Sequence, residues 1–364
     1  MIKGREYASL KARLDEVTAQ GLRRTLRILE PIDATHASFE GRRMTLFCSN
    51  DYLGLAHAPE LTRAARGGGA GSARLISGNR ASHSAIEDRL SALYGRPATL
   101  LSSGYHANLA LFATLLKRGM SVASDTLNHA SIIDGIRLAH ATRHIVPHGE
   151  PEHLPDVDLV AVEGLYSMDG DTLNLADYTG SHWLAVDEAH AFGCLGPQGK
   201  GVAAAQGVQP DFLVGTLGKA IGAYGAFIVG PPELRELLLS QGRSFIFTTG
   251  LPETVTNAAL AGIDRAIDGD DLRTKLAENA IKIRTGLKAL GLCVLGEHHI
   301  IPVILGDRAM PIAEALFDAG FLTTGIRPPT VAQGTERIRF TASAAHSDED
   351  IERLLDSLET ILKR

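Results

Sequence analysis

Short apolar runs alternate with helical patterns over the first two thirds of the chain. Most of these runs are rich in β-branched residues and end at glycine, proline or a charged residue. They are MSVASD (120–125), RHIVPH (143–148), VDLVAVEG (157–164), SHWLAVDEAH (181–190), DFLVGTLG (211–218) and GAFIVG (225–230). Strands that alternate with helices are typical of a parallel sheet covered by helices, so the pattern predicts an α/β fold.

Helical periodicity marks the segments around these runs. Residues 83–95 have helical spacing and close at Gly95, and residues 102–119 form a turn that leads into a helix. From about residue 231 helical patterns dominate, with few strands among them. This change predicts a large domain with a mostly parallel sheet, followed by a smaller α+β domain.

We therefore divide the chain into an N-terminal helical arm (1–45), a large domain (46–245) and a small C-terminal domain (246–364). The arm should form an amphipathic helix, because its apolar residues recur at helical spacing. These residues are Leu10, Leu14, Val17, Leu22 and Leu26.

Composition narrows the class of protein. The 364 residues are 45% hydrophobic and 21% charged, as in an ordinary globular protein, and the net charge of −6 gives no reason to expect nucleic acid or an anionic membrane as partner. No run reaches the roughly 18 consecutive apolar residues of a membrane helix. The three cysteines form no CxxC pair, so we expect reduced thiols and a cytoplasmic protein.

One lysine, Lys219, lies among small and apolar residues in VGTLGKAIGAYGAFIVG (214–230). It could be a solvated lysine, or a desolvated amine that forms a Schiff base. Asp187 ends the apolar run before it, where an acid either caps the next helix or partners a ligand. A lysine and an aspartate at one edge of a sheet match the needs of pyridoxal phosphate, whose ring nitrogen an acid keeps protonated.

Two helix starts are further candidates. In SSGYHAN (102–108), Ser103 with the amides of Gly104 and Tyr105 could cradle a phosphate, or Ser103 could simply cap the helix. His129 also lies near a helix start, where it could cap the helix or stack on a cofactor. Nucleotide-phosphate loops are excluded, because neither Lys200 nor Lys219 follows the Walker A spacing.

Several motifs, in order between about residues 20 and 360, resemble the α-oxoamine synthases. These fold-type-I pyridoxal-phosphate enzymes condense an amino acid with an acyl thioester. The motifs are SNDYLGL (49–55), SGNR (77–80), SSGYHANL (102–109), LNHASIIDG (127–135), EGLYSMDGD (163–171), VDEAHAFGCLGPQGKG (186–201), TLGKAIGAYGAF (216–227), FTTGLP (247–252) and IRPPTVAQGTERIRFTASAAH (326–346). The last motif favours the members that join L-alanine to a pimeloyl thioester in biotin biosynthesis. Pimeloyl-CoA is the expected thioester, with CoA as the leaving group.

The resemblance implies a role for each matching residue. Lys219 would hold the cofactor and shuttle a proton, Asp187 would pair with the ring nitrogen, and His129 and His190 would stack on the ring and bind its phenolic oxygen. Further cofactor contacts are implied for Ser103, Gly104, Tyr105, Ser167, Thr216 and, from the second subunit of a homodimer, Thr248. Asn50 and Arg327 would bind substrate, Arg327 by clamping the amino-acid carboxylate. No metal is expected.

Other readings stay open at this point. Arg23 and Arg24 could meet a substrate carboxylate or phosphate, but a solvated face is favoured. The chain could be a glycine-using, serine-using or long-chain acyl member of the same family. It could also be a pyridoxal-phosphate aminotransferase, which releases no thiol, or a scaffold without activity.

Overall fold

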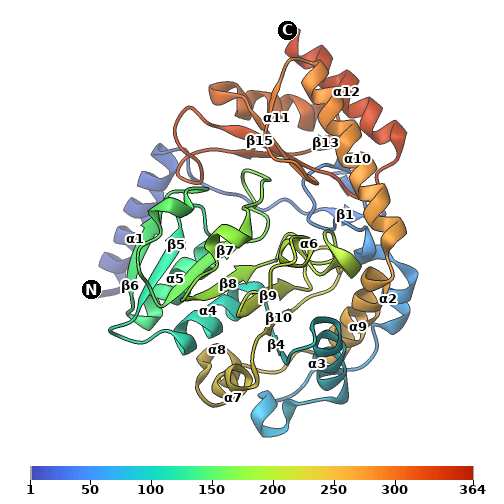
Figure 1. The fold of residues 1–364 in the computed structure, drawn as a ribbon. Coiled ribbons are helices and arrows are strands. Elements are labelled where there is room, and N and C mark those ends of the chain that lie inside the picture. Colours follow the sequence, from blue (N-terminus) through green and yellow to red (C-terminus); the bar gives the residue numbers. More distant parts are fainter. Residues whose placement is uncertain (1, 364) are drawn as a thin grey trace.

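The computed structural model describes residues 2–363, and a seven-stranded sheet lies at its centre (Figure 1). The strand order is β4 (Ala98–Leu101), β10 (Ala226–Val229), β9 (Phe212–Thr216), β8 (Trp183–Asp187), β7 (Leu159–Glu163), β5 (Ser121–Asp125) and β6 (Thr142–Val146). Only β10 runs antiparallel to its neighbours, and the strands from β9 to β6 are parallel. The predicted α/β fold with a mostly parallel sheet is confirmed.

Helices cover both faces of this sheet, as the continuous apolar strands require. Alternate residues of β8 face opposite cores: Leu184 and Val186 join one, Ala185 the other. The first core also holds residues of α3 (Ala81–Tyr94) and α9 (Glu253–Ile267). The second holds residues of α4 (Gly104–Leu115), α5 (Ala130–Ala139), α7 (Pro232–Gln241) and α8 (Arg243–Ile246).

The C-terminal third adds a separate small sheet, as predicted. Its strand order is β11 (Cys293–Val294), β12 (Ile300–Ile304), β15 (Arg337–Thr341) and β14 (Thr324–Ile326), and it carries α10 (Asp270–Ala289), α11 (Ala309–Asp318) and α12 (Asp348–Leu362). A further sheet has the order β1 (Glu30–Pro31), β2 (His36–Phe39), β3 (Arg42–Leu46) and β13 (Phe321–Leu322). The shorter helices are α2 (Pro59–Ala64) and α6 (Val202–Ala205).

Two contacts bear on the division of the chain. β3, from the predicted arm, pairs in parallel with β13 of the C-terminal third. α9, which begins after residue 245, packs against α2 and α3 beside the large sheet. The chain therefore crosses between the two units, and the boundaries at 45 and 245 stay predictions.

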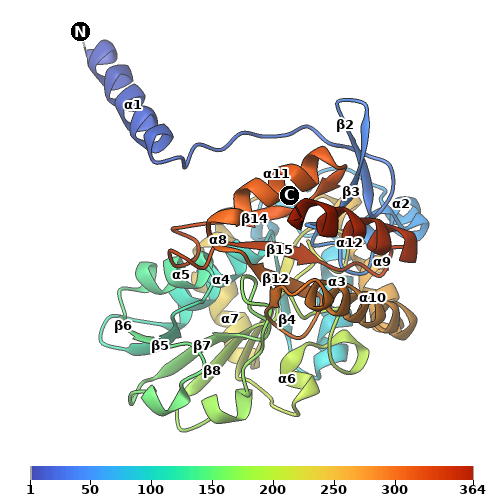
Figure 2. The same ribbon diagram turned by 90° about the horizontal axis from the view of Figure 1, so that it is seen from above.

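The N-terminal helix α1 (Ile2–Ala19) is shorter than the apolar pattern predicts. Gly21, at a φ of 66°, ends it with a left-handed residue, so Leu22 and Leu26 lie beyond the helix. Figure 2 shows α1 projecting from the body at the end of an extended segment. Its aliphatic residues are exposed: Leu10 by 57%, Leu14 by 46% and Val17 by 39%. Among residues 2–363, no helix has both the length and the hydrophobicity to cross a membrane.

Candidate active site

Four polar side chains stand at the carboxyl ends of neighbouring parallel strands. Asp125 ends β5, Glu163 ends β7, Asp187 ends β8 and Thr216 ends β9, and Glu163 lies directly opposite Asp187 in the strand register. Lys219 follows in the turn after β9. Parallel strands bring their carboxyl ends to one edge, and that edge is where open α/β sheets bind ligands.

The ends of β7, β8 and β9 line an open cavity with about 540 Å³ of empty space. The lining residues are Gly104, Tyr105, Asn108, His129, Ser131, Glu163, Asp187, Ala189, His190, Thr216 and Lys219. Seven of the residues expected from the sequence thus meet in one place, although they come from four separate stretches of the chain.

Lys219 is desolvated in this cavity. Burial lowers the pKa of its amine to about 8, although the carboxylates of Asp187 and Glu163 act in the opposite direction. Close packing explains why the residues around Lys219 are small. A side chain at Gly222, whose φ is 69°, would meet the backbone nitrogen of Ala56 at 2.4 Å. The structure therefore favours the desolvated interpretation of Lys219, whose half-buried side chain lies in the wall of the cavity.

Both oxygens of Asp187 are held in place. Its side chain is buried, its Oδ1 accepts a hydrogen bond from the backbone N–H of Ala189 at 2.9 Å, and its Oδ2 accepts one from the side-chain amide of Asn108 at 2.7 Å. The aspartate therefore caps the turn after β8 and also faces the cavity. The two readings of this residue are compatible.

Burial lowers the pKa of both histidines of the cavity, and that of His190 falls well below its ordinary value. The charge of Lys219 acts in the same direction on both, while the carboxylate of Asp187 acts in the opposite direction on His129. His129 caps α5, since its ring Nδ1 accepts a hydrogen bond from the backbone N–H of Ser131. The backbone N–H of His129 donates to the Glu163 carboxyl at 2.6 Å. His190 lies with its Nδ1 2.7 Å from the hydroxyl of Tyr52.

The start of α4 contributes Gly104 and Tyr105 to the wall of the cavity. β4 is antiparallel to β10, which is antiparallel to β9, so the end of β4 and the start of α4 reach the same edge as β9. Ser103 caps α4, as the simpler reading held, and the N-terminal amides at Gly104 and Tyr105 stay available. Thr216 lies beside Gly104. Free amides at a helix N-terminus suit a phosphate, so amine, carboxylate and anion site together fit pyridoxal phosphate.

A comparison with protein families shows to which family the chain belongs. Residues 42–358 match the aminotransferase class I and II family. The chain belongs to this family.

Known members give a closer likeness. The chain is 41% identical to a putative 8-amino-7-oxononanoate synthase of Desulforudis audaxviator, over 97% of this chain and 98% of that protein. It is 42% identical to an 8-amino-7-oxononanoate synthase of Anaeromyxobacter sp. strain K, over 96% and 94%. These full-length matches confirm the predicted resemblance to the α-oxoamine synthases.

Solved structures confirm the fold-type-I architecture within this aminotransferase class. Serine palmitoyltransferase of Sphingomonas wittichii superposes with a TM-score of 0.91 at 31% identity, covering 98% of this chain and 97% of that one. The 8-amino-7-oxononanoate synthase of Francisella tularensis superposes with a TM-score of 0.77 at 26% identity, covering 88% and 98%.

Other residues expected from the α-oxoamine synthase motifs lie outside the cavity. Thr248 lines a small separate pocket together with Thr249. Arg327 donates to the backbone carbonyl of Gly21, just after α1. Arg23 and Arg24 are exposed in the segment that follows, as the solvated reading holds.

The remaining two, Asn50 and Ser167, meet at an arginine that the motifs did not single out. Arg339 on β15 is 8% exposed and donates to the Ser167 carbonyl at 3.1 Å and to the Asn50 side-chain oxygen at 3.2 Å. Its buried Nε has no partner among the described residues. The signal in the sequence was the pair of arginines in RIRF, because Arg337 and Arg339 recur at strand spacing and both face inward.

Sequence reasoning also missed Asn108, Ser131 and Glu163. Helical spacing could have found Asn108, which lies one turn after Gly104 in the same motif. Glu163 is fully surrounded, and burial followed by the charge of Asp187 raises the pKa of its carboxyl to about 8. It therefore adds little negative charge beside Asp187 at neutral pH.

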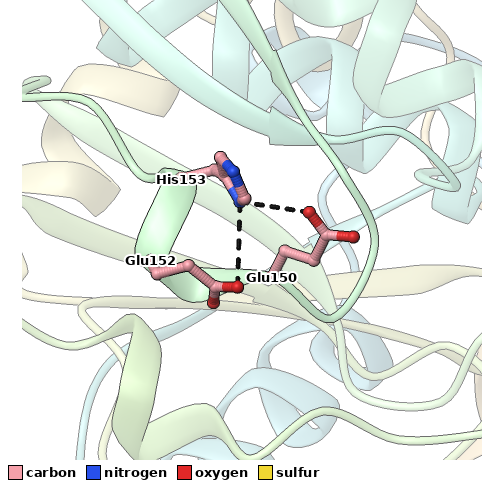
Figure 3. Close-up of side chains that lie close together, drawn as sticks. All are labelled: Glu150, Glu152 and His153. Atoms are coloured by element: carbon pink, nitrogen blue, oxygen red, sulfur yellow. Dashed lines mark ion pairs between the residues drawn. The ribbon is translucent and has the colours of Figure 1, made fainter.

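A cluster of Glu150, Glu152 and His153 lies on the surface after β6 (Figure 3). His153 pairs with Glu150 at 3.1 Å and with Glu152 at 3.8 Å, and about half or more of each side chain is exposed. None of the three lines the cavity. Exposed ion pairs of this kind are common on surfaces, and the cluster carries no argument for a metal.

Proposed function

We propose that the chain is a pyridoxal-phosphate-dependent acyltransferase that condenses L-alanine with pimeloyl-CoA. The products are 8-amino-7-oxononanoate, CoA and CO₂, a step of biotin biosynthesis. The observation that carries the proposal is the desolvated Lys219 in one cavity with Asp187 and the N-terminus of α4. The named function of relatives about 40% identical over almost the whole chain supports the choice of substrates.

The residues of the cavity have separate roles in the proposed reaction. Bound pyridoxal phosphate supplies an electron sink for the bond that breaks at the amino-acid α-carbon. Lys219 would hold the cofactor covalently, and its Nζ would take the α-proton of the amino acid. A pKa of about 8 suits this base, because proton transfer is fastest with a base that titrates near the working pH.

The other groups bind and orient. Asp187 would keep the ring nitrogen protonated, and the start of α4 with Ser103, Gly104, Tyr105 and Thr216 would hold the phosphate. His129 would pack on the ring, and His190 and Ser167 would bind its phenolic oxygen.

The amino-acid carboxylate has two candidate partners. Arg327 is the one that the resemblance implies. Arg339 is buried beside Asn50 and contributes to the lowered pKa of Lys219, which indicates that it lies near that amine. Its unpartnered Nε would gain the hydrogen bond that a buried donor requires. We propose that Arg339 binds the carboxylate and that Arg327 closes over it.

A homodimer with shared sites, active in the cytoplasm, completes the proposal. Thr248 would then reach the phosphate of the neighbouring site. Exposed apolar side chains nearby support an interface: Ile76 is 80% exposed and Phe247 is 72% exposed, and an isolated bridge between Ala73 and Thr249 joins their two segments. Large exposed apolar side chains that cluster are typical of interaction sites.

The release of free thiol tests the reaction. Purified protein with pyridoxal phosphate, pimeloyl-CoA and L-alanine should release CoA, and the Lys219→Ala variant should not. Glycine and L-serine serve as parallel substrates. Release that depends on serine would favour the second candidate, an enzyme like serine palmitoyltransferase, which the TM-score of 0.91 supports. Amino transfer without thiol release would reject both in favour of an aminotransferase.

A further inference from the structure

A chain of side-chain hydrogen bonds joins the second turn of α4 to the first turn of α5 in the wall of the cavity. Asn108 of α4 is 1% exposed, and its Nδ2 lies 2.7 Å from Oδ2 of Asp187 and 2.9 Å from Oγ of Ser131. Ser131 of α5, also 1% exposed, lies with its Oγ 2.7 Å from Nδ1 of His129. The chain thus links the carboxylate of the site to its ring-stacking histidine.

Each hydrogen bond in this chain has a fixed direction. An ionised Asp187 can only accept, and the amide nitrogen of Asn108 can only donate, so Asn108 donates to both Asp187 and Ser131. The hydroxyl of Ser131 accepts from Asn108 and keeps its own proton for Nδ1 of His129. The backbone N–H of Ser131 donates to the same nitrogen at 3.2 Å. Nδ1 therefore has no proton, and the ring carries its proton on Nε2.

Close packing of α4 against α5 makes this hydrogen-bond chain possible. A side chain at Gly135 of α5 would meet the backbone oxygen of Asn108 at 2.8 Å and Cβ of Phe112 at 3.1 Å. The glycine lets α5 approach α4 closely enough for Ser131 to reach Asn108. The Oδ1 of Asn108 is buried without a partner. An unsatisfied oxygen destabilises a fold, so the reason for the asparagine lies in the two hydrogen bonds that its nitrogen donates.

We propose that Asn108 is a positioning residue that fixes Asp187 toward the ring nitrogen and, through Ser131, keeps His129 neutral with its proton on Nε2. The inference rests on the proposed cofactor. A protonated imidazole stacked on a protonated pyridine ring would place two like charges face to face. By filling Nδ1 of His129 with donors, the chain prevents this repulsion and leaves Asp187 as the charge partner of the ring.

Two variants and one control test the assignment. Asn108→Ala removes both donations, and Ser131→Ala removes the hydroxyl only. Asn279→Ala is the matched control, because Asn279 of α10 is also fully buried, also donates two hydrogen bonds from Nδ2 and also has an unpartnered Oδ1, but lies outside the cavity. ¹⁵N-histidine NMR of the cofactor-free proteins reports the protonated nitrogen of His129, assigned with His129→Asn. Dissociation constants for pyridoxal phosphate are the second readout.

We expect wild-type His129 to carry its proton on Nε2. Asn108→Ala should weaken pyridoxal phosphate by roughly 10-fold or more, as expected for a lost hydrogen bond to a charged group, and Asn279→Ala should leave that affinity unchanged. Ser131→Ala should change the fraction of His129 that carries its proton on Nε2. This variant tests the hydrogen-bond chain if Asn108→Ala does not fold. A proton on Nδ1 in the wild type, or an Asn108→Ala protein with unaltered His129 signals and affinity, would overturn the proposal. Wild-type protein that binds no pyridoxal phosphate would reject the proposed cofactor instead, and the NMR result would still decide the hydrogen-bond chain.

Discussion

At the scale of single residues, chemistry in this protein depends on what surrounds a side chain rather than on its type. The amine of Lys219 has its pKa lowered from 10.5 to about 8 mainly by burial. The amine reacts only when neutral, so the rate at which pyridoxal phosphate attaches to the cofactor-free protein should rise about tenfold per pH unit up to about pH 8 and then level off. Absorbance of the attached cofactor measures the rate, and Lys219→Ala should show no attachment. A rate still rising tenfold per unit above pH 9 would contradict the desolvated amine.

The two arginines near the substrate make a second residue-scale prediction. Arg339→Lys keeps the charge but loses the planar fork, so KM for L-alanine should rise roughly 10- to 100-fold, the range for a lost hydrogen bond to a charged group. Arg327→Lys is the comparison and should have the smaller effect, because the Arg327 guanidinium donates to the Gly21 carbonyl, whereas Arg339 is buried beside Asn50. Initial rates at saturating pimeloyl-CoA give both values. The reverse order would assign the carboxylate to Arg327.

At the scale of elements, a histidine bridges two carboxylates beside the strand ends. His148, which follows β6, lies 2.9 Å from Asp125 and 2.8 Å from Asp171. Burial acts to lower its pKa, but the hydrogen bonds and charges of the two aspartates outweigh it and raise the pKa to about 10. Because the folded pKa exceeds the unfolded value of about 6.5, this stabilisation is complete below pH 6.5 and is lost as the pH rises through about 10.

His148→Gln should therefore lower the free energy of unfolding by about 2–3 kcal/mol at pH 6, a value reduced for partial exposure, and by much less at pH 10. Urea unfolding at the two pH values measures the difference. The exposed His153→Gln is the control and should change stability by no more than about 0.5 kcal/mol at either pH. Equal losses for His148→Gln at pH 6 and pH 10 would disprove the charged bridge.

The contact between α4 and α5 is also a property of elements. Alanine normally favours a helix over glycine by about 1 kcal/mol. Gly135→Ala should nevertheless destabilise the fold by about 1–3 kcal/mol, since the added methyl meets the Asn108 carbonyl. Gly69→Ala, where the structure leaves open space, should be close to neutral. Thermal unfolding of both variants checks the prediction, and a more stable Gly135→Ala would show that the helices can separate freely.

At the scale of the whole molecule, the proposed dimer should share its active sites. Lys219→Ala and Thr248→Arg should each be inactive alone. In a randomly mixed dimer the hybrid keeps one site with an intact lysine and an intact threonine, so co-expression should restore about a quarter of wild-type activity. Thiol release measures the activity, and sedimentation verifies the dimer. No recovery in a proven hybrid would place Thr248 in its own subunit's site.

The sequence by itself determined the elements and the strand-end chemistry. Periodicity is local, so it located the apolar strands and the helix that Gly95 closes at a φ of 70°. Because Asp187 ends one parallel strand and Lys219 follows the next, their shared edge followed from strand direction alone. The motif resemblance then named the family before any packing was known.

Only the tertiary structure decided which distant side chains meet. Asn108 lies 79 positions from Asp187, and Asn50 lies 289 positions from Arg339, so helix packing and strand register, not spacing, bring each pair together. The same holds for β3 and β13, which pair across almost the whole chain. The apolar pattern of α1 could not show that Leu10, Leu14 and Val17 would stay exposed among residues 2–363, because periodicity records which face is apolar and burial depends on what packs against it.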